Sequence, residues 1–529
     1  MYGKVISSCV NGMNGRLVEV EIDLSNGLPQ MNIVGLPDNS IRESTDRVRS
    51  AIKNCNFSFP MERITVNLAP ADLRKEGSAF DLAIAVGILQ TSGQIHLDDL
   101  ERTLFIGELS LDGGLRPIPG VLPMVHGARN EGLVKVMLPV QNAEEAALVE
   151  GIEVIPVSHL QDLSSGKLND PPTKLFNEAN HLLHKTKKAE KGIPAIQEED
   201  FNDVLGQYQA KRALMIAAAG MHNIMLIGPP GSGKTMLIRR LPSILPPLDD
   251  DEAMDVTKIY SIAGKLTDRS TFIRNRPFRA PHHTISQAGL IGGGSPPLPG
   301  EVSLAHKGVL FLDELPEFAR SVLEVLRQPL EDRRVAISRA RGMFVFPTDF
   351  MLAATMNPCP CGYYGSESET TPCTCSPHKI SAYRAKISGP LLDRIDLHVD
   401  VPRVDYRELS RQPISSRTTS EIPALGSSQI RQQILAAREV QYWRYAGEAI
   451  HTNGGLNGKL LRKHCRLKPD AEQLLFQSFQ ALGMSVRAHD RILKIARTIA
   501  DLEGSEQIDD RHLAEAIQYR NLDRKYTMS

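Results

Sequence analysis

The pattern of hydrophobic and polar positions divides the chain into three parts. Residues 1–168 alternate β-type segments such as RLVEVEIDL and RITVNLAP with helix-type segments such as SIRESTDRVRSAIKNC, which predicts an α+β domain. Residues 198–404 carry short apolar runs, NIMLIG, GVLFLDE and FMLAATMN, separated by helical stretches, and this is typical of a parallel sheet with helical crossovers. Residues 428–529 show helical periodicity alone. The polar segments between these parts, 169–197 and 405–427, are expected to be linkers.

The C-terminal part contains two segments whose apolar residues recur at helical spacing. We expect each helix to bury one face, formed by Ile430, Ile434, Ala437 and Val440 in the first and by Ile492, Ile495, Ala496 and Ile499 in the second. Packed together, such helices would form a small helical domain that follows the α/β part.

The composition fits a soluble protein of about three domains. The chain has 529 residues, 41% of them hydrophobic and 23% charged, and one domain usually takes ~100–200 residues. The formal net charge is -1, so a site for a polyanion would have to be a local basic patch. The segment from Met1 to Ser8 lacks the features of a secretory signal, and polar residues interrupt the apolar run from Leu214 to Leu226. We therefore expect a cytoplasmic protein without membrane contact.

A nucleotide-binding motif follows the first apolar run of the central part. GPPGSGKT lies between the expected strand NIMLI and a helical segment, which is the context that a P-loop requires. Its glycines let backbone N–H groups surround a phosphate, its lysine reaches the β and γ phosphates, and its threonine hydroxyl binds Mg²⁺. The residues expected to bind ATP are Gly228, Pro229, Pro230, Gly231, Ser232, Gly233, Lys234 and Thr235.

Two further strands of the central part end in polar residues. GVLFLDE ends in Asp313 and Glu314, which parallel strands would carry to the same sheet edge as the P-loop. We expect Asp313 to hold Mg²⁺ together with Thr235, and Glu314 to polarise the attacking water. The strand FMLAATMN ends at Asn357, whose amide is a candidate for orienting that water.

A short basic segment interrupts the chain between these two strands. EDRRVAISRARGMFVFP, residues 331–347, contains four arginines and has the alternation of a β-hairpin. With a turn around Arg341 and Gly342, the hairpin would carry Arg339 and Arg341 at its tip and Arg333 and Arg334 near its base. The alternative is a surface hairpin whose arginines pair with the neighbouring Glu331 and Asp332.

Four of the seven cysteines cluster directly after Asn357. Cys359 and Cys361 form one C-x-C pair, and Cys373 and Cys375 form another beyond an eleven-residue loop. Four thiolates so placed can complete a structural Zn²⁺ site, whereas reduced thiols or a redox pair are the alternatives.

These motifs resemble one family over essentially the whole chain. GPPGSGKT, LFLDE, AATMNPCPCG, SGPLLDRIDLHVDV and SVRAHDRILKIARTIADLE together are similar to the magnesium-chelatase-like AAA+ ATPases of the ComM/YifB type. The resemblance implies an AAA+ core with a helical lid and a homohexameric ring. It also implies that Arg394 is a finger inserted into the neighbouring subunit's ATP site, and that Arg487 is the lid sensor.

The resemblance also implies a function. In members of this clade, two elements project towards a central channel. They correspond here to the hairpin at 331–347, before the strand that ends at Asn357, and to the insert at 276–308. A collar of arginines there would fit a DNA backbone, which adds Arg276 and Arg279 to the candidate DNA contacts. We expect an ATP- and Mg²⁺-dependent hexameric DNA motor, a branch-migration helicase that acts with other recombination proteins in natural transformation on single-stranded, duplex or branched DNA.

The first 168 residues resemble the protease domain of Lon. KEGSAFDLAIA matches the region that carries the Lon serine, with Ser78 or Ala79 at its position, but Leu122 stands where the Lon lysine would be. A serine without a lysine base has no activator, so we expect a non-proteolytic domain that supports the ring or binds DNA. The rival functions are a chelatase-type remodeller that inserts Mg²⁺ into a porphyrin, a Lon-like ATP-dependent protease, and a DNA-binding scaffold without motor activity.

Overall fold

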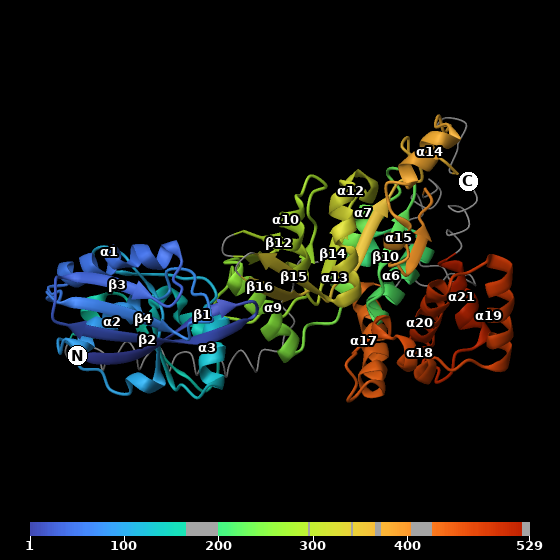
Figure 1. Ribbon diagram of the computed structural model, residues 1–529. Coiled ribbons are helices and arrows are strands. Elements are labelled where there is room, and N and C mark those ends of the chain that lie inside the picture. Colours follow the sequence, from blue (N-terminus) through green and yellow to red (C-terminus); the bar gives the residue numbers. More distant parts are fainter. Residues whose placement is uncertain (165–198, 295–296, 340–341, 366–371, 404–425, 521–529) are drawn as a thin grey trace.

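The computed structural model describes residues 1–164, 199–294, 297–339, 342–365, 372–403 and 426–520. Three bodies follow one another along the molecule, from the N-terminal sheet through the central sheet to the C-terminal helices (Figure 1). Of the two expected linkers, the first and all but the last two residues of the second lie outside the described residues.

The N-terminal body is the expected α+β domain. Its seven-stranded sheet has the order β3-β4-β2-β1-β5-β8-β9. Along β2, Val18, Val20, Ile22 and Leu24 are buried at alternate positions, as the sequence pattern predicts. The strands are β1 (Tyr2–Asn11), β2 (Asn14–Ser25), β3 (Gln30–Val34), β4 (Arg63–Ala69), β5 (Thr103–Phe105), β8 (Lys135–Pro139) and β9 (Glu153–Val157), with a separate pair β6 (Glu108–Leu109) and β7 (Leu115–Arg116). The helices are α1 (Asn39–Asn54), α2 (Asp81–Thr91), α3 (Val121–Asn130) and α4 (Ala143–Ala146).

The central body is built on a five-stranded parallel sheet. Its order is β11-β14-β17-β10-β18, formed by β11 (Phe278–Arg279), β14 (Val309–Leu312), β17 (Met351–Met356), β10 (Ile224–Ile227) and β18 (Leu397–Asp400). Every residue of β10, β14 and β17 is buried, which explains why these strands are continuous apolar runs in the sequence. The order places the P-loop strand β10 beside the strand that ends at Asn357, so the two motifs meet at one sheet edge.

Helices and small strand pairs surround this sheet. The helices are α6 (Tyr208–Gly220), α7 (Lys234–Arg239), α8 (Leu241–Ile244), α9 (Asp250–Ile262), α10 (Gln287–Ile291), α11 (Glu301–Leu304), α12 (Arg320–Val325), α13 (Arg327–Asp332), α14 (Pro377–Arg384) and α15 (Gly389–Leu392). The strand pairs are β12 (Gly292–Gly293) with β13 (Leu298–Pro299), and β15 (Arg334–Arg339) with β16 (Gly342–Pro347), which we call the basic hairpin.

The C-terminal helices share one apolar core with the central body. They are α17 (Ser427–Arg444), α18 (Gly458–His464), α19 (Pro469–Leu482), α20 (Val486–Leu502) and α21 (Asp510–Gln518). Ile434 and Ile492 belong to the same buried cluster as Leu214 of α6. The expected face of α20 is buried as predicted, but α17 differs because Val440 is 44% exposed and the neighbouring Gln441 is buried. No helix among the described residues is long and apolar enough to cross a membrane.

Candidate active site

The P-loop occupies the turn from β10 to α7. Gly231 and Gly233 have φ values of +76° and +87°, which side-chain-bearing residues rarely adopt. The ammonium group of Lys234 donates to the carbonyl oxygens of Gly228 (2.8 Å) and Pro229 (2.9 Å), and to Oδ1 of Asn357 at 3.2 Å. The lysine that the sequence assigns to phosphate therefore lies at the centre of the site, and Asn357 lies beside it.

Hydrogen bonds join the P-loop to the end of β14, which Asp313 and Glu314 follow. The Thr235 hydroxyl donates to Asp313, 3.2 Å from Oδ1 and 3.1 Å from Oδ2. Hydroxyl and carboxylate oxygens are ligands that Mg²⁺ prefers, so the donor set fits the expected ion. Burial lowers the pKa of Lys234, and the charges of Asp313 and Glu314 act in the opposite direction, as they would if these groups share one site.

Thr355 of β17 completes this arrangement, and sequence reasoning missed it. Its hydroxyl donates to Asp313 Oδ1 and accepts from the backbone N–H of Glu314 at 3.0 Å. Glu314 itself is exposed and has a left-handed φ of +54°. Because Thr355 is only 1% exposed, its polar side chain in an otherwise apolar strand was the signal that could have found it. Thr355 thus fixes the positions of Asp313 and Glu314 relative to β17.

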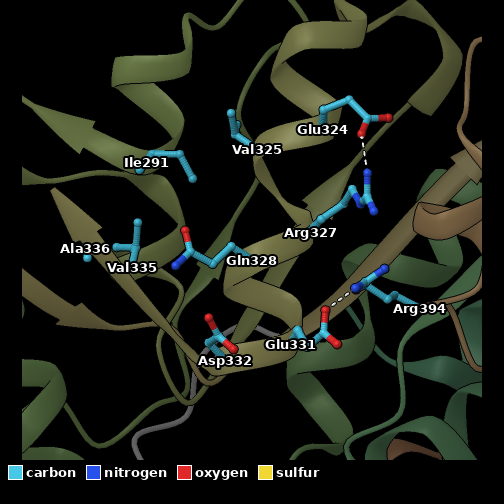
Figure 2. Close-up of a pocket in the computed structure, with 10 residues that line it drawn as sticks. All are labelled: Ile291, Glu324, Val325, Arg327, Gln328, Glu331, Asp332, Val335, Ala336 and Arg394. Carbon is cyan, nitrogen blue, oxygen red and sulfur yellow. Dashed lines mark hydrogen bonds and ion pairs between the residues drawn. The ribbon is translucent and has the colours of Figure 1, made fainter. Parts of the chain in front are cut away.

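Arg394 lies away from the P-loop of its own chain. It follows α15 and pairs with Glu331 of α13 (Figure 2). It also donates to the Pro390 carbonyl at 2.7 Å. The ion pair lowers the pKa of Glu331. Glu331 and Arg394 line a cavity, and none of the other residues that line it belongs to the P-loop. Arg394, whose side chain is 14% exposed, thus lies in a cavity separate from the P-loop of its own chain.

Arg487 shares a second cavity with Arg394. It lies at the start of α20, 65% exposed, with Nη1 3.6 Å from Asp393 Oδ2. The cavity, of about 500 Å³, is also lined by Arg491 and Lys494 and by no P-loop residue. Arg487 therefore lies in one cavity with Arg394 and not with Lys234 of the same chain.

Comparisons with known proteins agree with this geometry. Family models described as "Magnesium chelatase, subunit ChlI", "Subunit ChlI of Mg-chelatase" and "Magnesium chelatase, subunit ChlI C-terminal" match residues 200–409, 20–142 and 424–520. The chain is 43% identical to the competence protein ComM of Haemophilus influenzae over 516 residues, 98% of this chain and 97% of that protein. It is 40% identical to the uncharacterized protein YifB of Escherichia coli over 97% of this chain and 96% of that protein.

The chain belongs to the magnesium-chelatase-like AAA+ family, ComM/YifB type. The fold class inferred from the sequence is thereby confirmed. The chain is also similar to Lon protease 2 of Bacillus subtilis, with 28% identity over 191 residues, which are 32% of this chain and 34% of that protein.

The basic hairpin is the antiparallel pair that the sequence pattern predicts. Arg339 pairs with Gly342, so Gly342 is the first residue of β16, whereas the sequence suggested that it belongs to the turn. Arg341 lies outside the described residues, as does the Arg339 side chain. Val335, Ile337 and Phe346 are buried and attach the hairpin to the ATPase core.

The two arginines at the hairpin base differ in their surroundings. Arg333 lies 3.3 Å from Asp349 and lines the cavity that holds Arg487, whereas Arg334 is exposed. Glu331, which the alternative hypothesis assigned to the hairpin arginines, pairs with Arg394 instead.

Arg276 and Arg279, which were candidate DNA contacts, have partners inside the chain. Arg276 is 8% exposed and donates to Glu252 at 2.7 Å and to the Lys307 carbonyl at 2.7 Å. Arg279 forms a two-pronged ion pair with Glu301, with N–O distances of 2.6 and 2.9 Å. Breaking a bidentate or multiply bonded guanidinium contact costs free energy. We therefore assign these two arginines to the packing of the insert at 276–308 and leave them out of the proposed DNA contact.

The four clustered cysteines converge next to the P-loop. Their sulfur atoms all lie within 4.8 Å of one another, and Cys359 Sγ is 3.3 Å from Cys361 Sγ and 3.8 Å from Cys373 Sγ. A tetrahedron of thiolates with Zn–S bonds of about 2.3 Å has edges of about 3.8 Å, so the donor set fits zinc. A Cβ on Gly362 would lie 2.6 Å from Pro230 Cδ, which places the cysteine loop against the P-loop.

The Lon-like positions of the first domain lack a catalytic pair. Ala79 and Leu122 belong to one buried apolar cluster. Ser78 donates to the carboxylate of Glu108, and Lys75 donates to the Pro70 carbonyl. Neither contact pairs Ser78 with a lysine, which is the base that the Lon serine uses.

Proposed function

We propose that the protein is an ATP-dependent DNA motor that works as a homohexameric ring. The observation that carries this proposal is the position of Arg394, which completes no ATP site within its own chain although the rest of the hydrolytic set is present. An arginine that lies outside the P-loop site of its own chain can instead stabilise the transferring phosphoryl group of a neighbour. Arg487 lies in the same cavity as Arg394, so we propose that both act on the neighbouring subunit's nucleotide.

Each remaining residue then has one task in hydrolysis. Lys234 binds the β and γ phosphates, and Thr235 and Asp313 would hold the Mg²⁺ that neutralises phosphate charge. Glu314 polarises the attacking water, and Asn357, 3.2 Å from Lys234 Nζ, orients it next to the γ phosphate. Because the finger comes from another subunit, hydrolysis is coupled to the movement of subunits against one another.

We propose that the basic hairpin grips DNA phosphates in the central channel, through Arg334, Arg339 and Arg341. Six hairpins would form a cationic collar that binds a backbone regardless of base sequence. The similarity to a competence protein over nearly the whole chain supports branch migration during natural transformation, in the cytoplasm and alongside other recombination proteins. A motor that pulls single-stranded, duplex or branched DNA would extend the paired region of incoming and resident strands.

We propose that Cys359, Cys361, Cys373 and Cys375 hold a structural Zn²⁺. Bound zinc would fix the loop that leaves the sensor strand directly after Asn357 and packs on Pro230. The cysteine loop would then support the P-loop from outside, without contact with the reacting phosphate.

The test is ATPase activity with and without single-stranded, duplex and four-way DNA. We expect DNA to stimulate hydrolysis in the wild type, and Glu314→Gln to bind ATP but hydrolyse hardly at all. The matches to models of a chelatase subunit favour a second candidate function. It is that of a chelatase-type remodeller, which uses ATP in the insertion of Mg²⁺ into a porphyrin. An ATPase indifferent to all three kinds of DNA would favour that candidate.

A further inference from the structure

The N-terminal domain contacts the basic hairpin directly. The turn between β1 and β2 lies against β16, and a Cβ on Gly12 would come within 3.0 Å of the Val345 carbonyl oxygen. Val10, near the end of β1, and Met13, in this turn, pack against the apolar cluster that contains Val335 of the hairpin. Figure 1 shows the ends of β1 and β2 reaching β16. An element of the first domain thus supports an element that we assign to DNA.

A second contact fixes the first domain to α9 of the ATPase domain. Glu145 is 3% exposed, and its Oε1 accepts from the Ser261 hydroxyl at 2.5 Å and from the Leu122 N–H at 3.0 Å. The N–H of Gly120 donates to the Ser261 carbonyl at 3.1 Å. Met254 of α9 also packs against the apolar cluster around α3. A buried carboxylate with two donors is a specific contact, because losing either donor leaves the charge poorly compensated.

This second contact uses the segment that aligns with the lysine region of Lon. Leu122 stands at the lysine's position, and its backbone N–H is bound by the carboxylate that also binds Ser261. The same segment therefore serves as a docking surface for the ATPase domain.

The basic hairpin needs such support from outside. A two-stranded hairpin is marginally stable by itself, and the outward side chains of β16 are well exposed, with Met343 at 64% and Val345 at 38%. The ATPase core covers one face, through Val335 and Phe346. The β1–β2 turn lies at the middle of β16, where it can resist bending when the tip is loaded.

We propose that the N-terminal domain is a brace that holds the basic hairpin in its DNA-gripping position, and that α3 and α9 anchor this brace. The proposal rests on the proposed DNA motor function. It assigns the Lon-like domain a mechanical task, in which the β1–β2 turn transmits the position of the first domain to the hairpin. Force on the hairpin tip is then borne by two domains.

The test variant is Met13→Asp, which places a charge in the apolar contact with the hairpin. Among the described residues, Met13 packs against the cluster that contains the hairpin and against neither apolar cluster of its own domain, so the N-terminal domain should keep its melting transition. The matched control is Met61→Asp, since Met61 lies in the same domain and is 74% exposed. A milder variant, Met13→Ala, removes the contact without adding charge.

We expect hydrogen exchange of the β16 amides to become about tenfold faster in Met13→Asp and less so in Met13→Ala. Basal ATPase should stay within about twofold of the wild type, while DNA stimulation falls about tenfold or more. Wild-type exchange and stimulation in both Met13 variants would overturn the brace. If the wild type itself ignores DNA while β16 exchange still rises in the variants, the motor function fails and the contact stands.

Discussion

The substitution Thr355→Val tests the hydrogen bonds that organise the hydrolytic carboxylates. Valine has nearly the shape of threonine, so the β17 core stays filled, while the donor to Asp313 and the acceptor for the Glu314 N–H are both lost. A hydrogen bond to a charged group contributes about 1.5–3 kcal/mol and a neutral one about 0.5–1.5 kcal/mol. The two together are worth about 2–4.5 kcal/mol.

This loss should appear mainly in the rate of hydrolysis. The bonds position Asp313 and Glu314, whereas Lys234 and the P-loop backbone bind the phosphates. A loss of about 2 kcal/mol from the transition state slows hydrolysis roughly 30-fold, which is the smallest effect we expect. The affinity for ATP should change by less than about threefold.

The assay combines steady-state ATP hydrolysis with nucleotide binding followed by fluorescence. Thr355→Ser keeps the hydroxyl and should retain most of the activity. Thr348→Val is the control for packing, because Thr348 is equally buried at 1% and its hydroxyl donates only weakly, at 3.4 Å, to the Pro329 carbonyl. Hydrolysis by Thr355→Val at the rate of Thr348→Val would refute the assignment of Thr355 as a positioning residue.

Three further predictions concern the ring, the metal and the DNA grip. Arg394→Ala and Lys234→Ala should each be inactive, yet a mixture should regain part of the ATPase, since one variant supplies intact pockets and the other intact fingers; mixed rings without activity would contradict action between subunits. Purified protein should carry about one zinc per chain, measured by mass spectrometry, and Cys373→Ser should lose it; a well-folded, zinc-free wild type would exclude the metal. Replacing both Arg339 and Arg341 with alanine should spare basal ATPase, abolish strand displacement and flatten the salt dependence of DNA binding; full unwinding by this variant would show that another element pulls the DNA.

The sequence predicts best what local pattern determines. The strands β10, β14 and β17 are continuous apolar runs because parallel strands are buried on both faces. The P-loop can be recognised in the sequence because phosphate binding requires these residue types at this spacing. Strands β11 and β18 were missed, since both are short and one is only half-buried. Pattern alone cannot mark a strand of two residues.

Contacts between distant segments decide the rest. Helical periodicity favours Val440 for the core, yet Gln441 is buried there because its side chain donates to the Ala219 carbonyl and accepts from the Asn453 N–H. Arg276 looks like a free basic residue in the sequence, but Glu252, 24 positions away, pairs with it. The brace between the β1–β2 turn and the basic hairpin joins segments more than 300 residues apart, and no local pattern could reveal it.

Motion of branched DNA driven by ATP is the most direct test of the proposed function. A four-way junction with one labelled strand is incubated with wild-type protein or with Glu314→Gln, with and without ATP and Mg²⁺, and the products are separated by electrophoresis. We predict that the wild type resolves the junction into duplexes only when ATP is hydrolysed, and that Glu314→Gln binds the junction and leaves it intact. An intact junction with active wild-type ATPase, or equal resolution by Glu314→Gln, would contradict the account of this protein as a DNA motor.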